Sequence, residues 1–416
     1  MFESIKRNRR RRNMRKRSNR AAVQRRPRRP KRFNFAPILK IAGLIAAVGG
    51  LACVVIFLIV PWIKGESVGA PEPTPTETVA ATPTPEPTPI AKDDMSASAQ
   101  ILNIQYRNIN DPFVFGDEVV FTTGAKLQSQ PDIDRIAVYN LTTDTTTEMP
   151  RIELKYASLF EPKMNEKYIV YLDCKSQYGG NVCGYNRETS EMFVMREYLF
   201  GKPKVSLVGD YAVWMQQTSQ ARDKLYLYHM PTQESVAIEV FVNTPFSVSA
   251  AHMNEENIVY VQPEGENFLL DGSSASTNAE VVVMPLEDGG DKQITRFLTG
   301  TYVYDPMISG DYIVFMDGNA DYDSQLLYCT KQGDTYSEPQ VITSGILNYA
   351  VGDNYVVYTK DNVIYIYYFE DGSTGRLSTD TSRCMLATAN GKDVVWYDIT
   401  DGFDSGVNVI QHITVP

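Results

Sequence analysis

The stretch Gly209-Asp-Tyr-Ala-Val-Trp214 decides the fold, because its last four residues recur with variations in six other places along the chain. The seven copies are Glu118–Phe121, Tyr168–Tyr171, Tyr211–Trp214, Asn257–Tyr260, Tyr312–Phe315, Tyr355–Tyr358 and Asp393–Trp396. Val is third and an aromatic residue fourth in every copy, and a Gly or Asn turn precedes each one. This combination favours a buried strand entered through a tight turn. The copies are spaced about 46 residues apart, which is typical of propeller blades.

Each repeat contains four predicted strands, here called A to D, of which the Val-aromatic strand is B. The seventh repeat stops after strand C, because the chain ends at Pro416, whereas residues 101–107 form a spare strand before the first repeat. In a closed ring, the spare N-terminal strand takes the place of the strand that the seventh blade lacks. Closure of this kind removes an open sheet edge. We therefore predict an all-β, seven-bladed β-propeller with four-stranded blades, closed by the N-terminal strand 101–107. A six-bladed or irregular all-β fold is the alternative.

The clearest repeat, Gly209–Tyr228, combines Gly-Asp-Tyr-x-Val-Trp with a loop and Leu-Tyr-Leu-Tyr. This pattern, over roughly residues 116–413, resembles the TolB-like repeats of bacterial envelope propellers. The resemblance implies the architecture more than the function. Members of that family are mostly binding platforms, some of them fused to enzymes, and the resemblance carries over no catalytic residue.

The N-terminal part is organised as a membrane anchor. Ile41–Val60 contains 20 residues without a charge, enough to span a bilayer, and residues 1–35 contain 16 Lys and Arg against one acid. Positive flanks stay in the cytoplasm. We expect a disordered basic cytoplasmic tail (1–37), a transmembrane helix (38–63), a disordered Pro/Thr-rich linker (64–95) and a propeller ectodomain (96–416). A cleaved signal peptide is the alternative for the apolar run.

This organisation predicts a single-pass plasma-membrane protein whose C-terminal domain is extracytoplasmic. The Pro/Thr/Glu linker is similar to the spacers of Gram-positive surface proteins. The basic tail is expected to contact anionic lipid. It lacks aromatic residues between its charges and a folded module, so binding to nucleic acid is not expected.

The loops between strands B and C vary in length, and variable loops on a rigid scaffold often carry binding sites. We therefore expect the face that holds them, the B–C face, to bind the ligand. The aromatic residues that we expect to contact it are Tyr178, Phe268, Tyr322 and Phe403.

Two further features are candidate sites. Oxygen-bearing side chains alternate at Asp317, Asn319, Asp321 and Asp323, as in the first half of a calcium loop. The match ends there, because Tyr328 stands where such a loop has Glu, so calcium is a candidate cofactor and plain hairpin solvation is the alternative. Cys174 and Cys183 flank a short Gly-Gly loop and could form a disulfide across one hairpin.

The expected function is non-catalytic. His229, His252 and His412 have no spacing that suggests zinc or a Ser/His pair. We expect a binding or scaffold module for an envelope protein or glycan, not an enzyme. One alternative is a surface enzyme that acts on glycan or peptide with acidic loop residues. Another is a signalling anchor that couples outside binding to a cytosolic partner.

Overall fold

The chain divides into two compact units, residues 1–82 and 83–416, and everything described below belongs to the second. The computed structural model describes residues 90–106, 108–124, 133–150, 158–174, 179–218, 222–242, 249–263, 279–286, 295–300, 303–318, 324–400 and 408–416. The predicted basic tail, the membrane span and most of the linker lie outside these residues. Among the described residues, no helix is long and apolar enough to cross a membrane.

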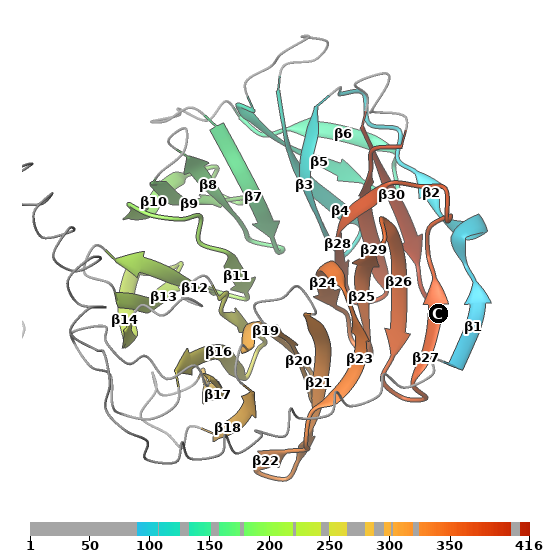
Figure 1. Ribbon diagram of the computed structural model, residues 1–416. Coiled ribbons are helices and arrows are strands. Elements are labelled where there is room, and N and C mark those ends of the chain that lie inside the picture. Colours follow the sequence, from blue (N-terminus) through green and yellow to red (C-terminus); the bar gives the residue numbers. More distant parts are fainter. Residues whose placement is uncertain are drawn as a thin grey trace, which may run out of the picture. The chain divides into compact units, whose positions relative to one another are not determined.

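Seven sheets radiate from a common axis, as predicted, and the four strands of a blade are antiparallel (Figure 1). Blades 1 to 3 consist of β3 (Ile109–Phe115), β4 (Glu118–Thr123), β5 (Arg135–Asn140) and β6 (Thr145–Glu148); β7 (Ser158–Met164), β8 (Tyr168–Cys174), β9 (Gly180–Asn186) and β10 (Met192–Tyr198); and β11 (Val205–Val208), β12 (Tyr211–Thr218), β13 (Arg222–His229) and β14 (Glu234–Val242). The first strand of each of these blades is the innermost one.

The remaining four blades follow the same order. Blades 4 and 5 consist of β15 (His252–Met253), β16 (Asn257–Pro263), β17 (Ala279–Pro285) and β18 (Thr295–Gly300); and β19 (Val303–Ser309), β20 (Tyr312–Asp317), β21 (Gln325–Gln332) and β23 (Gln340–Ser344), with β22 (Thr335–Tyr336) appended. Blades 6 and 7 consist of β24 (Ile346–Val351), β25 (Tyr355–Lys360), β26 (Val363–Tyr368) and β27 (Ser373–Arg376); and β28 (Cys384–Asn390), β29 (Asp393–Asp398) and β30 (Val409–Thr414).

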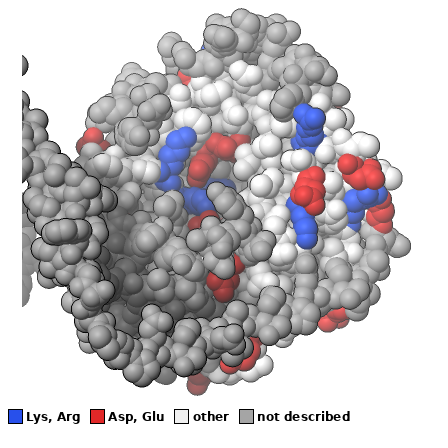
Figure 2. Space-filling view, viewed as in Figure 1, with Lys and Arg blue, Asp and Glu red and all other residues white. Residues whose placement is uncertain are grey.

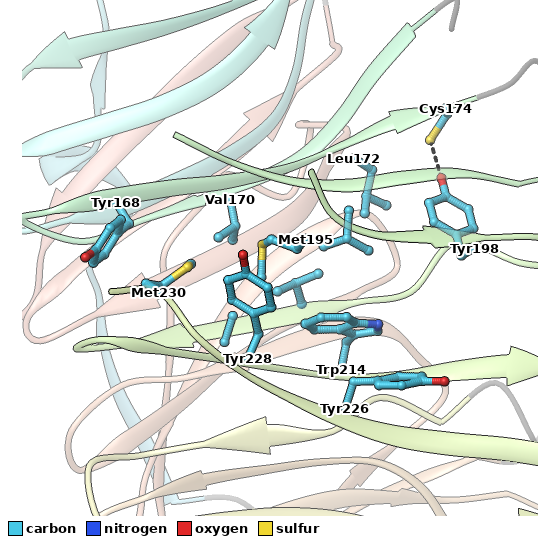
Figure 3. Packing of buried hydrophobic residues seen from close by; sticks show 13 residues of the cluster. Tyr168, Val170, Leu172, Cys174, Met195, Tyr198, Trp214, Tyr226, Tyr228 and Met230 are labelled. Carbon is cyan, nitrogen blue, oxygen red and sulfur yellow. Dashed lines mark hydrogen bonds between the residues drawn. The ribbon is translucent and has the colours of Figure 1, made fainter. Parts of the chain in front are cut away.

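The Val-aromatic strands form the core because both of their faces are covered by neighbouring blades. All seven residues of β8 are buried, as are Val213 and Trp214 of β12. Between blades 2 and 3, Leu172 packs into one cluster with Trp214 and its neighbours (Figure 3). Burying a large apolar side chain stabilises the fold by about 1.5–3 kcal/mol. This gain explains why the place of Trp214, the fourth residue of the copy, is aromatic in every repeat.

An N-terminal strand completes blade 7, but it is shorter than predicted. β2 (Gln100–Ile101) pairs with β30, and the N–H of Leu102 donates to the carbonyl of Ile410 at 2.9 Å. The described residues from 103 onward leave the sheet, and Tyr106 packs edge-on against Phe121 of blade 1. The prediction of a strand over 101–107 is therefore wrong in its extent and right in its role.

A second N-terminal strand lies where the sequence predicts disordered linker. β1 (Ile90–Asp94) pairs in parallel with β27 at the outer edge of blade 6 (Figure 1). Asp94 forms an ion pair with Arg376, and a short 3-10 helix, η2 (Ser96–Ser98), leads on to β2. We call residues 90–102 the strap, because they run along the outer edges of blades 6 and 7.

Candidate active site at the ring axis

Three innermost strands carry an acidic residue in a left-handed backbone conformation. The pairing register shifts at Asp111 (φ 50°) in β3, Glu161 (φ 50°) in β7 and Asp305 (φ 49°) in β19. Each of these residues precedes a proline, so the bulge recurs at equivalent places in blades 1, 2 and 5. Left-handed residues other than glycine cost of order 1–3 kcal/mol each and cluster at functional sites.

A lysine occupies the equivalent place in blade 3. By strand register, Lys204 stands just before β11 where Glu161 stands in β7. All four charged residues lie near the start of their innermost strands. Strand B runs antiparallel to strand A and ends at the same side of the ring, so these charges lie toward the face that carries the B–C loops.

The two acids of blades 1 and 2 are joined directly. The N–H of Glu161 donates to Oδ2 of Asp111 at 3.0 Å. The side chain of Glu161 is half-buried and interacts electrostatically with Lys163, Asp111, Lys204 and Lys202. Burial raises the pKa of Glu161, and the neighbouring lysines partly oppose that shift. Glu161 can therefore hold a proton at a higher pH than an exposed glutamate can.

Lys163 interacts electrostatically with both Glu161 and His252. Burial lowers the pKa of Lys163, whose Nζ lies 4.6 Å from the centre of the Phe113 ring. Nδ1 of His252 accepts a hydrogen bond from the N–H of Ile308 at 3.3 Å, and burial lowers the pKa of this histidine to about 4. His252 is therefore neutral at pH 7, and the charge of Lys163 adds to the lowering of its pKa.

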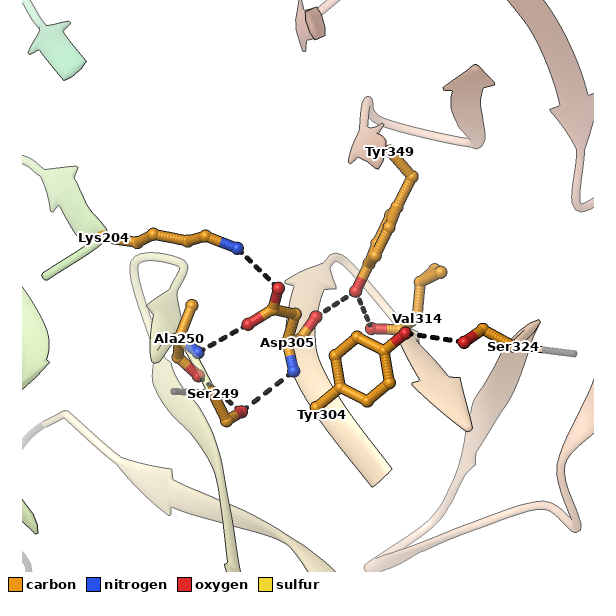
Figure 4. Close-up of polar contacts among 8 residues, drawn as sticks. All are labelled: Lys204, Ser249, Ala250, Tyr304, Asp305, Val314, Ser324 and Tyr349. Carbon is orange, nitrogen blue, oxygen red and sulfur yellow. Dashed lines mark hydrogen bonds and ion pairs between the residues drawn. The ribbon is translucent and has the colours of Figure 1, made fainter. Parts of the chain in front are cut away.

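Asp305 connects four blades (Figure 4). Its Oδ1 accepts the N–H of Ala250 at 2.8 Å, and its own N–H donates to Oγ of Ser249 at 2.9 Å. Its Oδ2 lies 2.5 Å from Nζ of Lys204, which reaches it from blade 3. The hydroxyl of Tyr349, in blade 6, donates to the Asp305 carbonyl. Figure 2 shows lysine or arginine and acidic side chains gathered around the middle of this face of the ring.

The predicted binding residues are not among those the structure describes. Tyr178, Phe268, Tyr322 and Phe403 lie outside the described ranges, so their place on the B–C face stays a prediction. Asn319, Asp321 and Asp323 also lie outside them. Among the described residues, no three His, Cys, Asp or Glu side chains come together as a metal site.

The remaining member of the predicted calcium loop, Asp317, occupies a position that is polar in every blade. The sixth residue from the start of each Val-aromatic copy is Thr123, Asp173, Gln216, Gln262, Asp317, Lys360 or Asp398. In blade 7, Asp398 accepts hydrogen bonds from Thr400 and Gln411 and so stabilises the strand end. This repetition favours a structural role for the position in all seven blades.

The possible disulfide between Cys174 and Cys183 is not present in the structure. Cys174 and Cys183 are both free and buried. In the hairpin register Cys174 pairs with Gly180 and Cys183 with Tyr171, and the two side chains join different core clusters on opposite faces of the sheet. Cys174 instead lies 2.9 Å from the hydroxyl of Tyr198 (Figure 3).

Sequence reasoning missed the charged cluster at the axis, although a signal for it was present. Asp111-Pro, Glu161-Pro and Asp305-Pro each stand four or five residues before the Gly or Asn turn. An acid-proline pair at this repeated place marks the bulge. The contribution of Lys204 has no such signature, because that residue lies in a connection and not in a repeated motif.

The comparisons with known proteins support the fold. No protein-family model matches the sequence, and no curated protein is significantly similar to it. The β-propeller domain of the Trilobed protease from Pyrococcus furiosus is 13% identical with a TM-score of 0.51, covering 75% of this chain and 93% of that one. An oligogalacturonate lyase in complex with manganese is 11% identical (TM-score 0.51), covering 76% and 93%.

A prolyl endopeptidase is 10% identical with a TM-score of 0.52, and the match covers 70% of this chain but 45% of the endopeptidase. This chain thus spans less than half of that enzyme. TolB from Acinetobacter baumannii is also among the similar structures. Its TM-score is 0.41 at 10% identity. The propeller fold is supported by the other three structures, and no particular protein is identified.

These neighbours correct the expected function. We expected a non-catalytic module and no enzyme, whereas the similar structures are mostly enzymes or the propeller domains of enzymes. At 10–13% identity the likeness itself shows the fold alone. The chemistry of this chain therefore has to be argued from its own charged cluster.

Proposed function

We propose that this protein is a membrane-anchored enzyme that cleaves an extracytoplasmic glycan, with its active centre at the ring axis. In this proposal Glu161 donates a proton to the leaving oxygen as the glycosidic bond breaks. The Asp111 carboxylate takes a proton from the water whose oxygen bonds to the anomeric carbon. The observation that carries the proposal is the pairing of these two acids at equivalent bulges of adjacent blades, 3.0 Å apart from backbone N–H to carboxylate.

Glycoside cleavage needs two carboxyl groups with different roles, one of which must keep its proton near neutral pH. Burial raises the pKa of Glu161, which suits it for the acid role. The N–H of Glu161 holds Asp111 in place beside it. A proton donor and a second carboxylate are thus supported from neighbouring strands rather than from loops.

Peptide cleavage is less well supported by the described residues. His229 lies 3.0 Å from Thr232 Oγ1, and His412 lies 2.8 Å from Asp393, both away from the cluster. His252 has its Nδ1 occupied by a backbone N–H. None of these histidines is hydrogen-bonded to a serine or cysteine nucleophile in the described part of the chain. The match with the oligogalacturonate lyase covers 93% of that chain. This coverage suits an enzyme whose propeller works without a second catalytic domain.

The location of the enzyme follows from the sequence. The apolar run of residues 41–60 and the basic tail before it would hold the N-terminus in the cytoplasm. The Pro/Thr-rich linker would then carry the propeller away from the membrane, toward the envelope glycan of a Gram-positive cell. The tail would contact anionic lipid on the inner side of the membrane.

The proposal is tested with residues 83–416, which form a compact unit. Envelope glycan fragments and envelope peptides are incubated separately with this unit, and the products are identified by mass spectrometry. We expect shortened glycans, intact peptides and no glycan products from Glu161→Gln. Glu188→Gln, an exposed residue in the turn between β9 and β10, is the matched control. Cleaved peptides, or full glycan cleavage by Glu161→Gln, would contradict the proposal.

A further inference from the structure

The connection between β10 and β11 places two lysines beside the proposed proton donor. Lys202 and Lys204 are exposed, and the buried Pro203 between them fixes their backbone. In an extended segment, residues two apart point to the same side. We propose that Lys202 and Lys204 form a subsite for an anionic group on the glycan, so that the substrate carries a carboxylate or phosphate next to the bond that is cleaved. This inference rests on the proposed function.

Lys202 is held in place without a counter-ion. Its Nζ lies 3.4 Å from the centre of the Phe160 ring, a close cation–π contact. Lys202 makes no ion pair with any residue that the structure describes. An exposed ammonium that an aromatic ring positions, and that forms no close ion pair with a described carboxylate, is available to an anionic ligand.

Lys204 has a counter-ion that an anionic ligand could replace. Its Nζ lies 2.5 Å from Oδ2 of Asp305, and its side chain remains 51% exposed (Figure 4). Asp305 does not depend on this contact for its position, because Ala250 and Ser249 hold it through separate hydrogen bonds. The Asp305 carboxylate thus occupies the place that a substrate anion would take, and competes with it for Lys204.

The subsite lies at the reacting centre. Lys202 contacts Phe160, the residue directly before Glu161, and both lysines act electrostatically on Glu161. A group bound by Lys202 would therefore lie at the bulge that carries Glu161. The same connection contains Phe200, which is 42% exposed, and in this proposal its ring covers the apolar face of the sugar. An anionic sugar, with a charge for the lysines and an apolar face for the ring, fits this arrangement better than a neutral one.

Binding measurements separate the subsite from catalysis. Residues 83–416 carrying Glu161→Gln are titrated calorimetrically with a uronate tetrasaccharide, its neutral methyl ester and a phosphorylated oligosaccharide of the same length. We expect the ester to bind about tenfold more weakly than the better of the two anionic probes. Whichever anionic probe binds more tightly identifies the group as carboxylate or phosphate.

Three substitutions make the test specific. Lys202→Ala and Lys204→Ala should each abolish most of the preference for the anionic probe. Asp305→Asn should instead tighten its binding severalfold, because the amide still accepts the Ala250 N–H but no longer competes for Lys204. Lys167→Ala, which removes a lysine paired with Asp210 at the A–B turns, should change nothing.

Equal binding of the ester and both anionic probes would overturn the subsite, and so would weaker binding by Asp305→Asn. Failure of the proposed function gives a different pattern. In that case the wild-type unit releases no product from any probe, while the preference for the anionic probe and its dependence on Lys202 and Lys204 persist.

Discussion

The backbone N–H of Glu161 donates to Oδ2 of Asp111 at 3.0 Å, so the acid of one blade is fixed by the backbone of the acid in the next. Both residues adopt a left-handed conformation before a proline, at the bulge of an innermost strand. This conformation is costly for residues with a side chain, and it recurs where charged groups meet near the axis. The relationship makes separate predictions for chemistry and for stability.

Two substitutions of Asp111 should separate its structural and chemical roles. Asp111→Asn keeps an oxygen that accepts the Glu161 N–H, so we expect a melting temperature close to that of the wild type. Glycan cleavage should fall by about 10²–10⁴-fold, because the carboxylate is lost. Asp111→Ala should lower both activity and melting temperature. A fully active Asp111→Asn protein would exclude a chemical role.

A buried aspartate in blade 3 should make stability depend on pH. Asp223 is 2% exposed, and its Oδ1 has no hydrogen-bond partner among the described residues. Burial raises the pKa of Asp223 from 3.8 to about 7. Between these values the folded protein binds the proton more tightly than the unfolded chain does, so the stability that the proton provides is complete below pH 4 and is lost as the pH rises toward 7.

The loss should amount to at most about 4 kcal/mol. Urea unfolding at several pH values between 4 and 8 measures it in the wild type and in Asp223→Asn, which has no proton to lose. We expect the stability difference between the two proteins to shift in favour of the variant as the pH rises. A difference that is constant with pH would mean that Asp223 ionises in the folded state as it does in the unfolded chain.

The strap should contribute unequally to ring closure. A chain that begins at Met95 lacks β1 but keeps β2 on blade 7. A chain that begins at Asn103 lacks both strands and also Leu102, which is 8% exposed and is worth about 1.5–3 kcal/mol. We expect the melting temperature to fall slightly in the first chain and by several degrees more in the second. Equal losses would contradict closure through β2.

The cysteines should behave as buried free thiols. Burial raises the pKa of Cys183 and of Cys329 to about 12 and that of Cys384 to about 11. Cys174 is buried as well. We therefore expect four thiols in residues 83–416 to react with a chromogenic disulfide reagent at pH 8 after unfolding, and hardly any before. Two thiols after unfolding without reductant would show that a disulfide does form.

The fold could be predicted largely from the sequence, because a repeated strand has to meet the same burial requirement in every blade. Val213 and Trp214 are buried on both faces of their sheet, and this constraint is visible as a pattern in all seven copies. The exact closing strand was less predictable. Gln100 and Ile101 are both exposed, so no burial pattern distinguishes them from the residues that follow.

The charged cluster depends on contacts between blades, which the order of residues does not reveal. Lys204 and Asp305 are 101 positions apart and meet across the ring. Cys174 and Cys183 are close in sequence, but the two-residue period of the strands sends their side chains to opposite faces. Spacing alone suggested a possible bond for the second pair and gave no sign of the first.

The central claim is that Glu161 protonates the leaving group, and two substrates with different leaving groups test it most directly. One should release a sugar, which needs a proton, and the other dinitrophenolate, which needs none. We predict that Glu161→Gln lowers kcat/KM for the first by about 10²–10⁴-fold and for the second by far less. An equal loss on both substrates, or none on either, would contradict the assignment of Glu161 as the proton donor.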